Sequence, residues 1–144
     1  MSRSQFLSMH FKIRVSAQGH CDIVDLTPQA RALLEGTEVR EGIATFFVCG
    51  STAGLTTLEF EPGLIRDVKE FFERILPEAR GYHHDKTWGD GNGFSHLRAA
   101  LLKPSLTVPI VAGALALGTW QQVVLIDFDN RPRTREVVFQ IQAA

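Results

Sequence analysis

The pattern of apolar and polar positions at the start of the chain predicts two strands and a helix. Residues 9–15 alternate between apolar and polar side chains, which is typical of a strand with one buried face. After a turn at Gly19, residues 20–26 form a second strand, so we expect a β-hairpin. Thr27 then acts as an N-cap, and Pro28 occupies the first position of a short helix.

The middle of the chain predicts two more strands and a longer helix. Residues 43–49 are a near-continuous apolar segment, which is typical of a buried strand, and residues 54–60 form a further strand. Pro62 begins a helix and Pro77 ends it. The apolar stripe of this helix, expected to face the core, consists of Leu64, Val68, Phe71 and Ile75.

The second half begins with an irregular segment and ends in strands. Residues 81–93 are rich in glycine, histidine and aspartate, and we expect a long loop. A short helix over 95–102 follows. The remaining apolar segments, 107–111, 120–128 and 135–142, predict the last strands.

These elements predict one α+β domain. The chain has 144 residues, and a single domain spanning 1–144 matches the usual domain size of about 100–200 residues. Strands outnumber helices and cluster at both ends of the chain. We therefore expect mixed, mostly antiparallel β-sheets with two or three helices rather than a regular βαβ array.

Charge and composition narrow the function classes. The net charge of -1 argues against a nucleic-acid-binding protein, which usually carries a basic excess. Residues 104–126 are uncharged and long enough to span a bilayer, but their prolines, glycines and glutamines favour strands, so no membrane span is expected. The two cysteines, Cys21 and Cys49, are too few for a disulfide scaffold, and no secretion signal is evident. A cytoplasmic location is expected.

The histidine-rich segment 82–96 is the first candidate for chemistry. His84, Asp90 and His96 carry the imidazole and carboxylate groups that both proton transfer and metal binding require. In an extended segment His83 would point away from His84, so we expect one of the two at a given site. A polar loop whose side chains cap turns explains the same residues, and no zinc-type spacing is present.

The segment 118–121 is the second candidate. Trp120 and Gln121 could stack on and hydrogen-bond a heterocycle. The spacing alone favours the simpler interpretation, a core tryptophan at the start of a strand.

Three arginines form the third candidate. Arg131, Arg133 and Arg135 share one side of an extended chain, and guanidinium groups suit phosphate. A solvated basic strand edge is the more ordinary explanation.

Residues 49–53, which follow a predicted buried strand, are the fourth candidate. Hydroxyls and amides here suit an anion, whereas Cys49 is expected to be a buried strand cysteine rather than a nucleophile.

Taken together, these motifs resemble the YjbQ-like family, often labelled secondary thiamine-phosphate synthases. The resemblance covers almost the whole chain as an ordered string of motifs. These are Ser51-Thr52-Ala53 with Leu55 and Glu59, Asp67 and Pro77, the block Tyr82, His84, Asp85, Asp90, Gly91, Asn92, Ser95 and His96, then Ser105, Pro109, Gly113 and Gly118-Thr119-Trp120-Gln121, and finally Pro132-Arg133-Thr134-Arg135.

The resemblance implies an α+β fold, a homotrimer and a small phosphorylated ligand. Its nearest named activity is a weak thiamine-phosphate synthase, which joins a pyrimidine methyl diphosphate to a thiazole phosphate and expels pyrophosphate. Such chemistry needs a divalent cation, magnesium or zinc, and an alternative is a non-catalytic trimer that binds an anion or a metal. The residues expected to bind ligand are Thr52, Glu59, Asn92, Ser95, Trp120, Gln121, Arg133 and Arg135.

Catalysis is expected from His84, His96 and Asp90, and metal ligation from His84 and His96. The chain departs from the family pattern at two positions. Gly50 stands where the family has a histidine, and Leu58 where it commonly has asparagine. A three-histidine site is therefore not expected.

Overall fold

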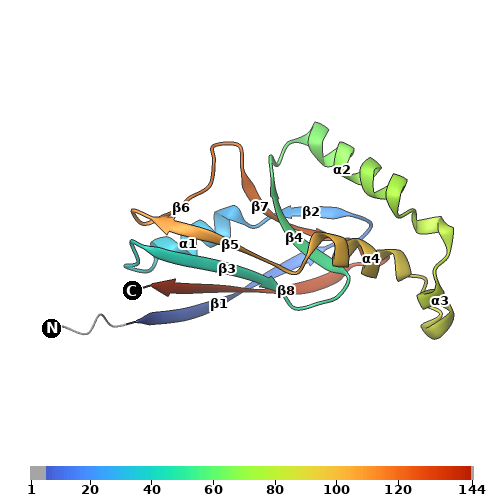
Figure 1. The fold of residues 1–144 in the computed structure, drawn as a ribbon, viewed down its shortest axis with the longest axis horizontal. Coiled ribbons are helices and arrows are strands. Elements are labelled where there is room, and N and C mark those ends of the chain that lie inside the picture. Colours follow the sequence, from blue (N-terminus) through green and yellow to red (C-terminus); the bar gives the residue numbers. More distant parts are fainter. Residues whose placement is uncertain (1–5, 144) are drawn as a thin grey trace.

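The fold consists of two layered antiparallel sheets, with α2, α3 and α4 at one end and α1 near the other end beside β6 (Figure 1). The computed structural model describes residues 6–143, so residues 1–5 and 144, the ends of the expected domain, lie outside the described residues. The strands are β1 (Leu7–Ala17), β2 (Asp22–Asp25), β3 (Gly42–Val48), β4 (Ala53–Leu58), β5 (Ser105–Val111), β6 (Ala114–Leu115), β7 (Gln122–Asp127) and β8 (Arg133–Ala143). The helices are α1 (Thr27–Glu35), α2 (Pro62–Ile75), the 3-10 turn η1 (Glu78–Arg80), α3 (His83–Trp88) and α4 (Gly93–Leu102).

The main core lies between the two sheets. The larger sheet has the order β1-β8-β3-β5-β6 and the smaller one β2-β7-β4, and all strand pairs are antiparallel. Alternate side chains of β3 and β8 point inward, where the rings of Phe46 and Phe139 pack with their centroids 4.8 Å apart. The α+β class with antiparallel sheets is thus confirmed.

The predicted hairpin between the first two strands is wrong. β1 pairs with β8 in the larger sheet, whereas β2 pairs with β7 in the smaller one. Gly19, His20 and Cys21 all have positive φ, and the His20 amide donates to the Asp129 carbonyl. The chain therefore crosses from one sheet to the other at this turn instead of folding back on itself.

The expected N-cap of α1 is shifted by one residue. Leu26 occupies the cap position, while the Thr27 hydroxyl accepts a hydrogen bond from the Val123 amide of β7. The helix ends before Gly36 as predicted.

β3 is less buried than its apolar sequence suggested. Ile43 and Phe47 lie on the outer face of the larger sheet, and 45% of Phe47 is exposed.

Residues 104–126 form β5, the two-residue β6 and β7, in agreement with the expected strands. No helix within residues 6–143 is long and apolar enough to cross a membrane.

The buried face of α2 differs from the predicted stripe. Phe72 is buried and packs edge-on against Phe128, with Ile65 and Val68 beside it. These residues belong to a second apolar cluster, which includes Val124 and Ile126 of β7. Phe71 and Ile75, which we expected inside, are exposed. Figure 1 shows α2 running outward from β4 toward α3, and only Ile65, Val68 and Phe72 of this helix pack in the cluster.

A buried arginine ties α2 to α4. Arg98 is 1% exposed, and its guanidinium lies among the rings of Phe72, Phe94 and Phe128. Its Nε and Nη2 donate to the Leu76 carbonyl at 3.0 and 2.8 Å, and Nη2 also pairs with Glu73. The segment that leads from α2 into α3 is thereby fixed on α4.

Candidate functional site

The first wall of the site begins with a short helix where we predicted a loop. α3 is stabilised at its start by Asp85, whose carboxylate accepts from the amides of Tyr82 and Gly93, both at 2.9 Å. The same side chain thus caps α3 and holds the start of α4. His83 and His84 occupy the first turn of α3 and are not extended, so the expected geometry was wrong, although His83 is exposed and His84 faces inward.

The close approach of α3 and α4 brings two imidazoles together. The rings of His84 and His96 have centroids 4.3 Å apart. Gly93 permits this approach, because a Cβ there would lie 2.7 Å from the Cβ of Tyr82 and 3.2 Å from that of His84. A larger residue at position 93 would push the two helices, and therefore the two imidazoles, apart.

The imidazole pair disfavours a positive charge. Burial lowers the pKa of His96, and the positive charge that His84 carries when protonated lowers it further. His84 Nδ1 lies 3.9 Å from Asp90 Oδ1, which is beyond hydrogen-bonding distance. Among the described residues, His84 Nδ1 and Asn92 Oδ1 are buried polar atoms without a hydrogen-bond partner. Buried polar atoms normally have hydrogen-bond partners, so these two unpartnered atoms point to a ligand or a water molecule at the site.

The second wall is a buried ionic network at the ends of β7 and β8. Arg135 donates to both carboxylate oxygens of Asp127, at 2.7 and 2.9 Å, and its Nη2 also donates to the Thr52 hydroxyl. Thr52 in turn donates to Asp129 at 3.0 Å. The Thr52 hydroxyl therefore both accepts and donates a hydrogen bond within the protein, and it positions Arg135.

Asp129 connects this wall to the helices. Its carboxylate accepts from Thr52, from Asn92 Nδ2 at 3.3 Å and from Arg133 Nε at 2.5 Å. Burial alone would raise the pKa of Asp129, but these hydrogen bonds and one from the Asn130 amide outweigh it and lower the pKa below its usual value. Asp129 is therefore a permanent anion at neutral pH.

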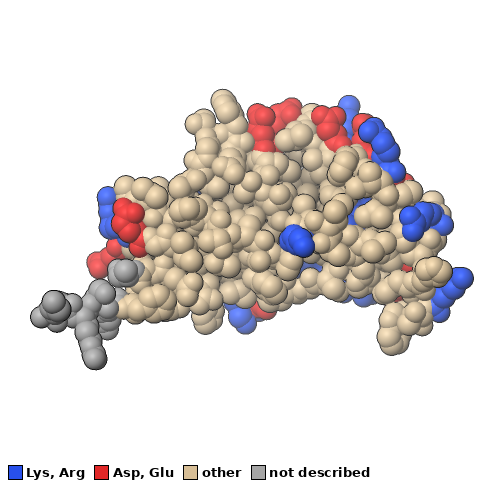
Figure 2. Space-filling view, viewed as in Figure 1, with Lys and Arg blue, Asp and Glu red and all other residues tan. Residues whose placement is uncertain are grey.

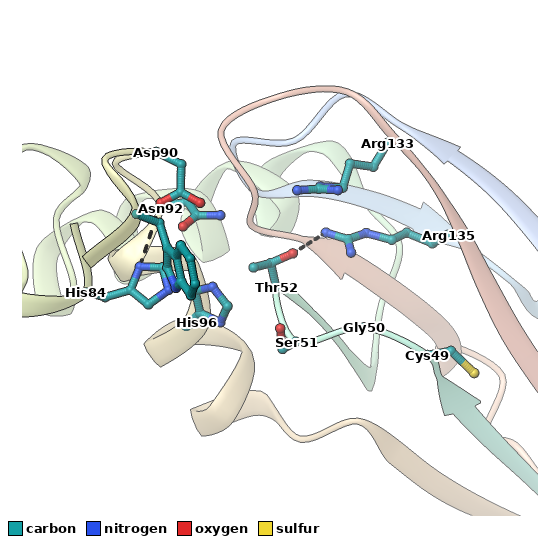
Figure 3. Close-up of a pocket in the computed structure, with 11 residues that line it drawn as sticks. Cys49, Gly50, Ser51, Thr52, His84, Asp90, Asn92, His96, Arg133 and Arg135 are labelled. Atoms are coloured by element: carbon teal, nitrogen blue, oxygen red, sulfur yellow. Dashed lines mark hydrogen bonds and ion pairs between the residues drawn. The ribbon is translucent and has the colours of Figure 1, made fainter. Parts of the chain in front are cut away.

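The two walls enclose a cavity of about 530 Å³ (Figure 3). The imidazoles of α3 and α4 face Arg133, Arg135 and the β3–β4 loop across it. The lining residues are Cys49, Gly50, Ser51, Thr52, His84, Trp88, Asp90, Asn92, His96, Arg133 and Arg135.

The cavity brings together seven of the residues that were expected to bind ligand or to carry catalysis: Thr52, His84, Asp90, Asn92, His96, Arg133 and Arg135. Four others lie outside its lining. Ser95 is buried and donates to the Asn92 carbonyl, and Glu59 is exposed after β4. Gln121 bonds to the Gly118 amide and to Thr57 in a turn. Trp120 is 73% exposed, so the expected core tryptophan is wrong.

Two further expectations are corrected here. Arg135 is buried in the ionic network and is not part of a solvated edge, and Cys49 is exposed at the cavity rather than buried in its strand. The buried cysteine is Cys21, where burial raises the pKa of the thiol to about 11.

Sequence reasoning also missed functional candidates. Asp127 and Asp129 fix the arginines, and Trp88 lines the cavity. The acidic pair, which ends a buried strand shortly before the arginines, is a signal that could have been used.

The described residues provide only some of the ligands that a metal ion needs. Within residues 6–143, no three His, Cys, Asp or Glu side chains converge as a ready-made metal site. His84 and His96 supply two nitrogen donors, and the unpartnered Asn92 oxygen lies on the same wall.

Comparisons with known proteins agree with this fold. A sequence profile of the family described as "UPF0047 protein YjbQ-like" matches residues 11–144. A UPF0047 protein from Archaeoglobus fulgidus is 40% identical over 81% of this chain and 88% of its own length, and one from Synechocystis is 34% identical over 98% and 97%. The crystal structure of a YbjQ-like protein of unknown function from Sulfolobus solfataricus has a TM-score of 0.91 at 28% identity, covering 97% of this chain and 100% of its own.

The imidazole pair makes a testable prediction about titration. Because burial and the neighbouring His84 both oppose protonation, His96 should titrate below the value of about 6.5 of a free imidazole in an NMR pH series. The unfolded chain then binds more protons than the folded one as pH falls through this range, so His96 lowers stability at acidic pH. In His84→Ala the midpoint of His96 should rise, with the exposed His10 as the reference signal. A native midpoint at or above 6.5 would contradict the assignment.

Proposed function

The chain belongs to the UPF0047 family of YjbQ-like proteins, and we propose that it is a small enzyme acting on phosphorylated molecules at the cavity between the helical wall and the ionic network. The observation that carries this proposal is that one cavity has two arginines on one wall and two imidazoles on the other. The first pair suits anion binding and the second suits proton transfer.

The arginine wall supports phosphate binding through directed donors. Asp129 engages Nε of Arg133, which leaves the end of this half-buried guanidinium at the cavity. Arg135 uses Nε and Nη2 inside the protein, and its Nη1 lies against Gly50, 2.9 Å from the position of a Cβ. Two arginines and two aspartates give no net charge. The wall therefore attracts an anion by hydrogen-bond geometry, and the exposed Ser51 adds a hydroxyl.

The imidazole wall supports acid–base chemistry. His96 is held neutral, because burial and His84 lower its pKa, so it can accept a proton at neutral pH. Asp90 sits on the same wall, near His84 Nδ1. In this proposal His84 and His96 exchange the proton, and Asp90 orients the pair.

The nearest named activity for this arrangement is thiamine-phosphate synthesis. The pyrimidine and thiazole rings of that reaction need a flat surface. Trp88, exposed at the cavity, is better placed for this in one chain than Trp120. The reaction also needs a divalent cation, magnesium or zinc, to neutralise charge on the departing pyrophosphate. His84 and His96 would supply two of its ligands, and with the cation bound they would not act as the proton-transfer pair.

A second candidate is a non-catalytic protein that binds a small anion or a divalent metal. It is favoured by the unpartnered buried atoms His84 Nδ1 and Asn92 Oδ1, to which a bound ion or molecule could hydrogen-bond or coordinate.

For either candidate we propose a cytoplasmic location, supported by Cys49, an exposed thiol without a disulfide partner.

We further propose that the protein is a homotrimer. Figure 2 shows charged side chains along α2 and at the ends of the molecule, with a broad surface nearly free of charge between them. Exposed apolar side chains on the outer faces of β3 and β5, namely Ile43 and Val111, also favour burial against another subunit. Light scattering at micromolar concentration should give the mass of three chains, and a stable monomer would refute this proposal.

Phosphate binding is tested at Arg133. In a calorimetric titration with pyrophosphate, Arg133→Gln should weaken binding by roughly 10- to 100-fold, the value of a charge-assisted contact. Asp129 keeps its bonds from Thr52, Asn92 and the Asn130 amide, so the fold should persist. The matched control is Arg131→Gln, which removes the same charge at an exposed position. Equal affinities in both variants would rule out the arginine wall as a phosphate site.

Catalysis is tested at the histidines. In an assay that forms thiamine phosphate from the two precursors, His84→Ala and His96→Ala should each abolish turnover, because each removes one half of the proton-transfer pair. His83→Ala, an equivalent change at an exposed neighbour, should retain activity. Thermal melting controls for folding. If pyrophosphate binds but the native protein has no turnover, the binding-protein candidate is favoured.

A further inference from the structure

An apolar cavity of about 410 Å³ adjoins the site and has no role in the chemistry described so far. Gly50, Ser51 and His96 line both cavities. The remaining lining residues, which we call the apolar annex, are Phe47, Val48, Ala53, Ala99, Ala100 and Pro104. The annex therefore extends the site past His96 toward the C-terminal end of β3, at Phe47 and Val48.

The annex exists because small residues meet where a helix packs on strands. α4 lies against β4, and it presents Ala99 and Ala100 toward the annex. Gly50 adds no side chain at the junction of the two cavities. Phe47 and Pro104 add apolar surface to the lining, and Phe47 is 45% exposed. Exposed aromatic surface beside a polar site is costly to leave in water, so a ligand group would gain by covering it.

Another cavity near the imidazoles fits this role less well. It is larger, about 770 Å³, and is lined by Tyr82, Leu97 and charged residues that include Arg80 and Lys86. It shares His84 and His96 with the site but none of the anion-binding groups. The annex, by contrast, shares Ser51 with the site, so a ligand that binds at Ser51 already contacts a residue of both cavities.

We infer that the site takes a phosphate monoester whose organic group is small, flat and apolar, with the phosphate at Arg133 and Ser51 and the organic group in the annex against Phe47. This inference rests on the proposed function, because it requires the arginine wall to bind phosphate. The volume is sufficient, since a cavity of roughly 150 Å³ already holds a benzene molecule.

The test is a calorimetric comparison of three probes on the native protein: inorganic phosphate, methyl phosphate and phenyl phosphate. Phenyl phosphate should bind about tenfold or more tightly than methyl phosphate, because the ring buries apolar surface that a methyl group lacks. Ala100→Leu fills the annex without removing a polar group and should abolish this preference while leaving the affinity for inorganic phosphate unchanged. Ala32→Leu, the same substitution at an exposed position of α1, is the matched control.

Each outcome has a distinct meaning. If inorganic phosphate does not bind, the proposed function fails and this inference fails with it. If phosphate binds but the phenyl ester has no advantage, or keeps its advantage in Ala100→Leu, the annex is not the organic subsite and only this inference is overturned. Light scattering of Ala100→Leu completes the test. If the variant changes the assembly state instead of ester preference, the annex is a contact between copies of this chain, which also overturns the inference.

Discussion

The site depends on one buried carboxylate, that of Asp129. Hydrogen bonds to it arrive from three separate parts of the chain: Thr52 after β3, Asn92 before α4, and Arg133 of β8. Removing a carboxylate from water is expensive, and only such a set of donors offsets the cost. Because these donors come from both walls, the strand wall and the helical wall are held at a fixed separation, and the cavity between them is a consequence of satisfying Asp129.

The same network explains why the arginines can be functional although they are paired. Asp127 engages two nitrogens of Arg135, which fixes the plane of its guanidinium and its remaining edge. A fixed donor loses little entropy when an anion binds, so a neutral wall can still be selective. The proposed division of labour follows, with anion binding on rigid strands and proton transfer on the helices.

The sequence predicted the elements better than their partners. Alternation located β1 and β8, and the glycine- and histidine-rich segment located the imidazoles. Periodicity could not show that the turn at Gly19 leads into the other sheet, because strand pairing is decided by non-local contacts. It also missed α3, since Asp85 stabilises that helix through the distant Gly93 amide. Trp88 escaped notice because its importance comes only from its position, and Trp120 was assigned to the core because an exposed tryptophan is uncommon.

The anchoring of the helical segment has a consequence for motion. The strands of the second wall belong to sheets whose hydrogen bonds extend across the molecule. α2 and α3, by contrast, are attached mainly through Phe72, Arg98 and the Asp85 bonds. Proteins open locally in units whose free energies follow such differences in anchoring. We therefore expect the two walls to belong to different cooperative units, so that His84 can leave the cavity with α3 in a local opening while the arginines stay in place.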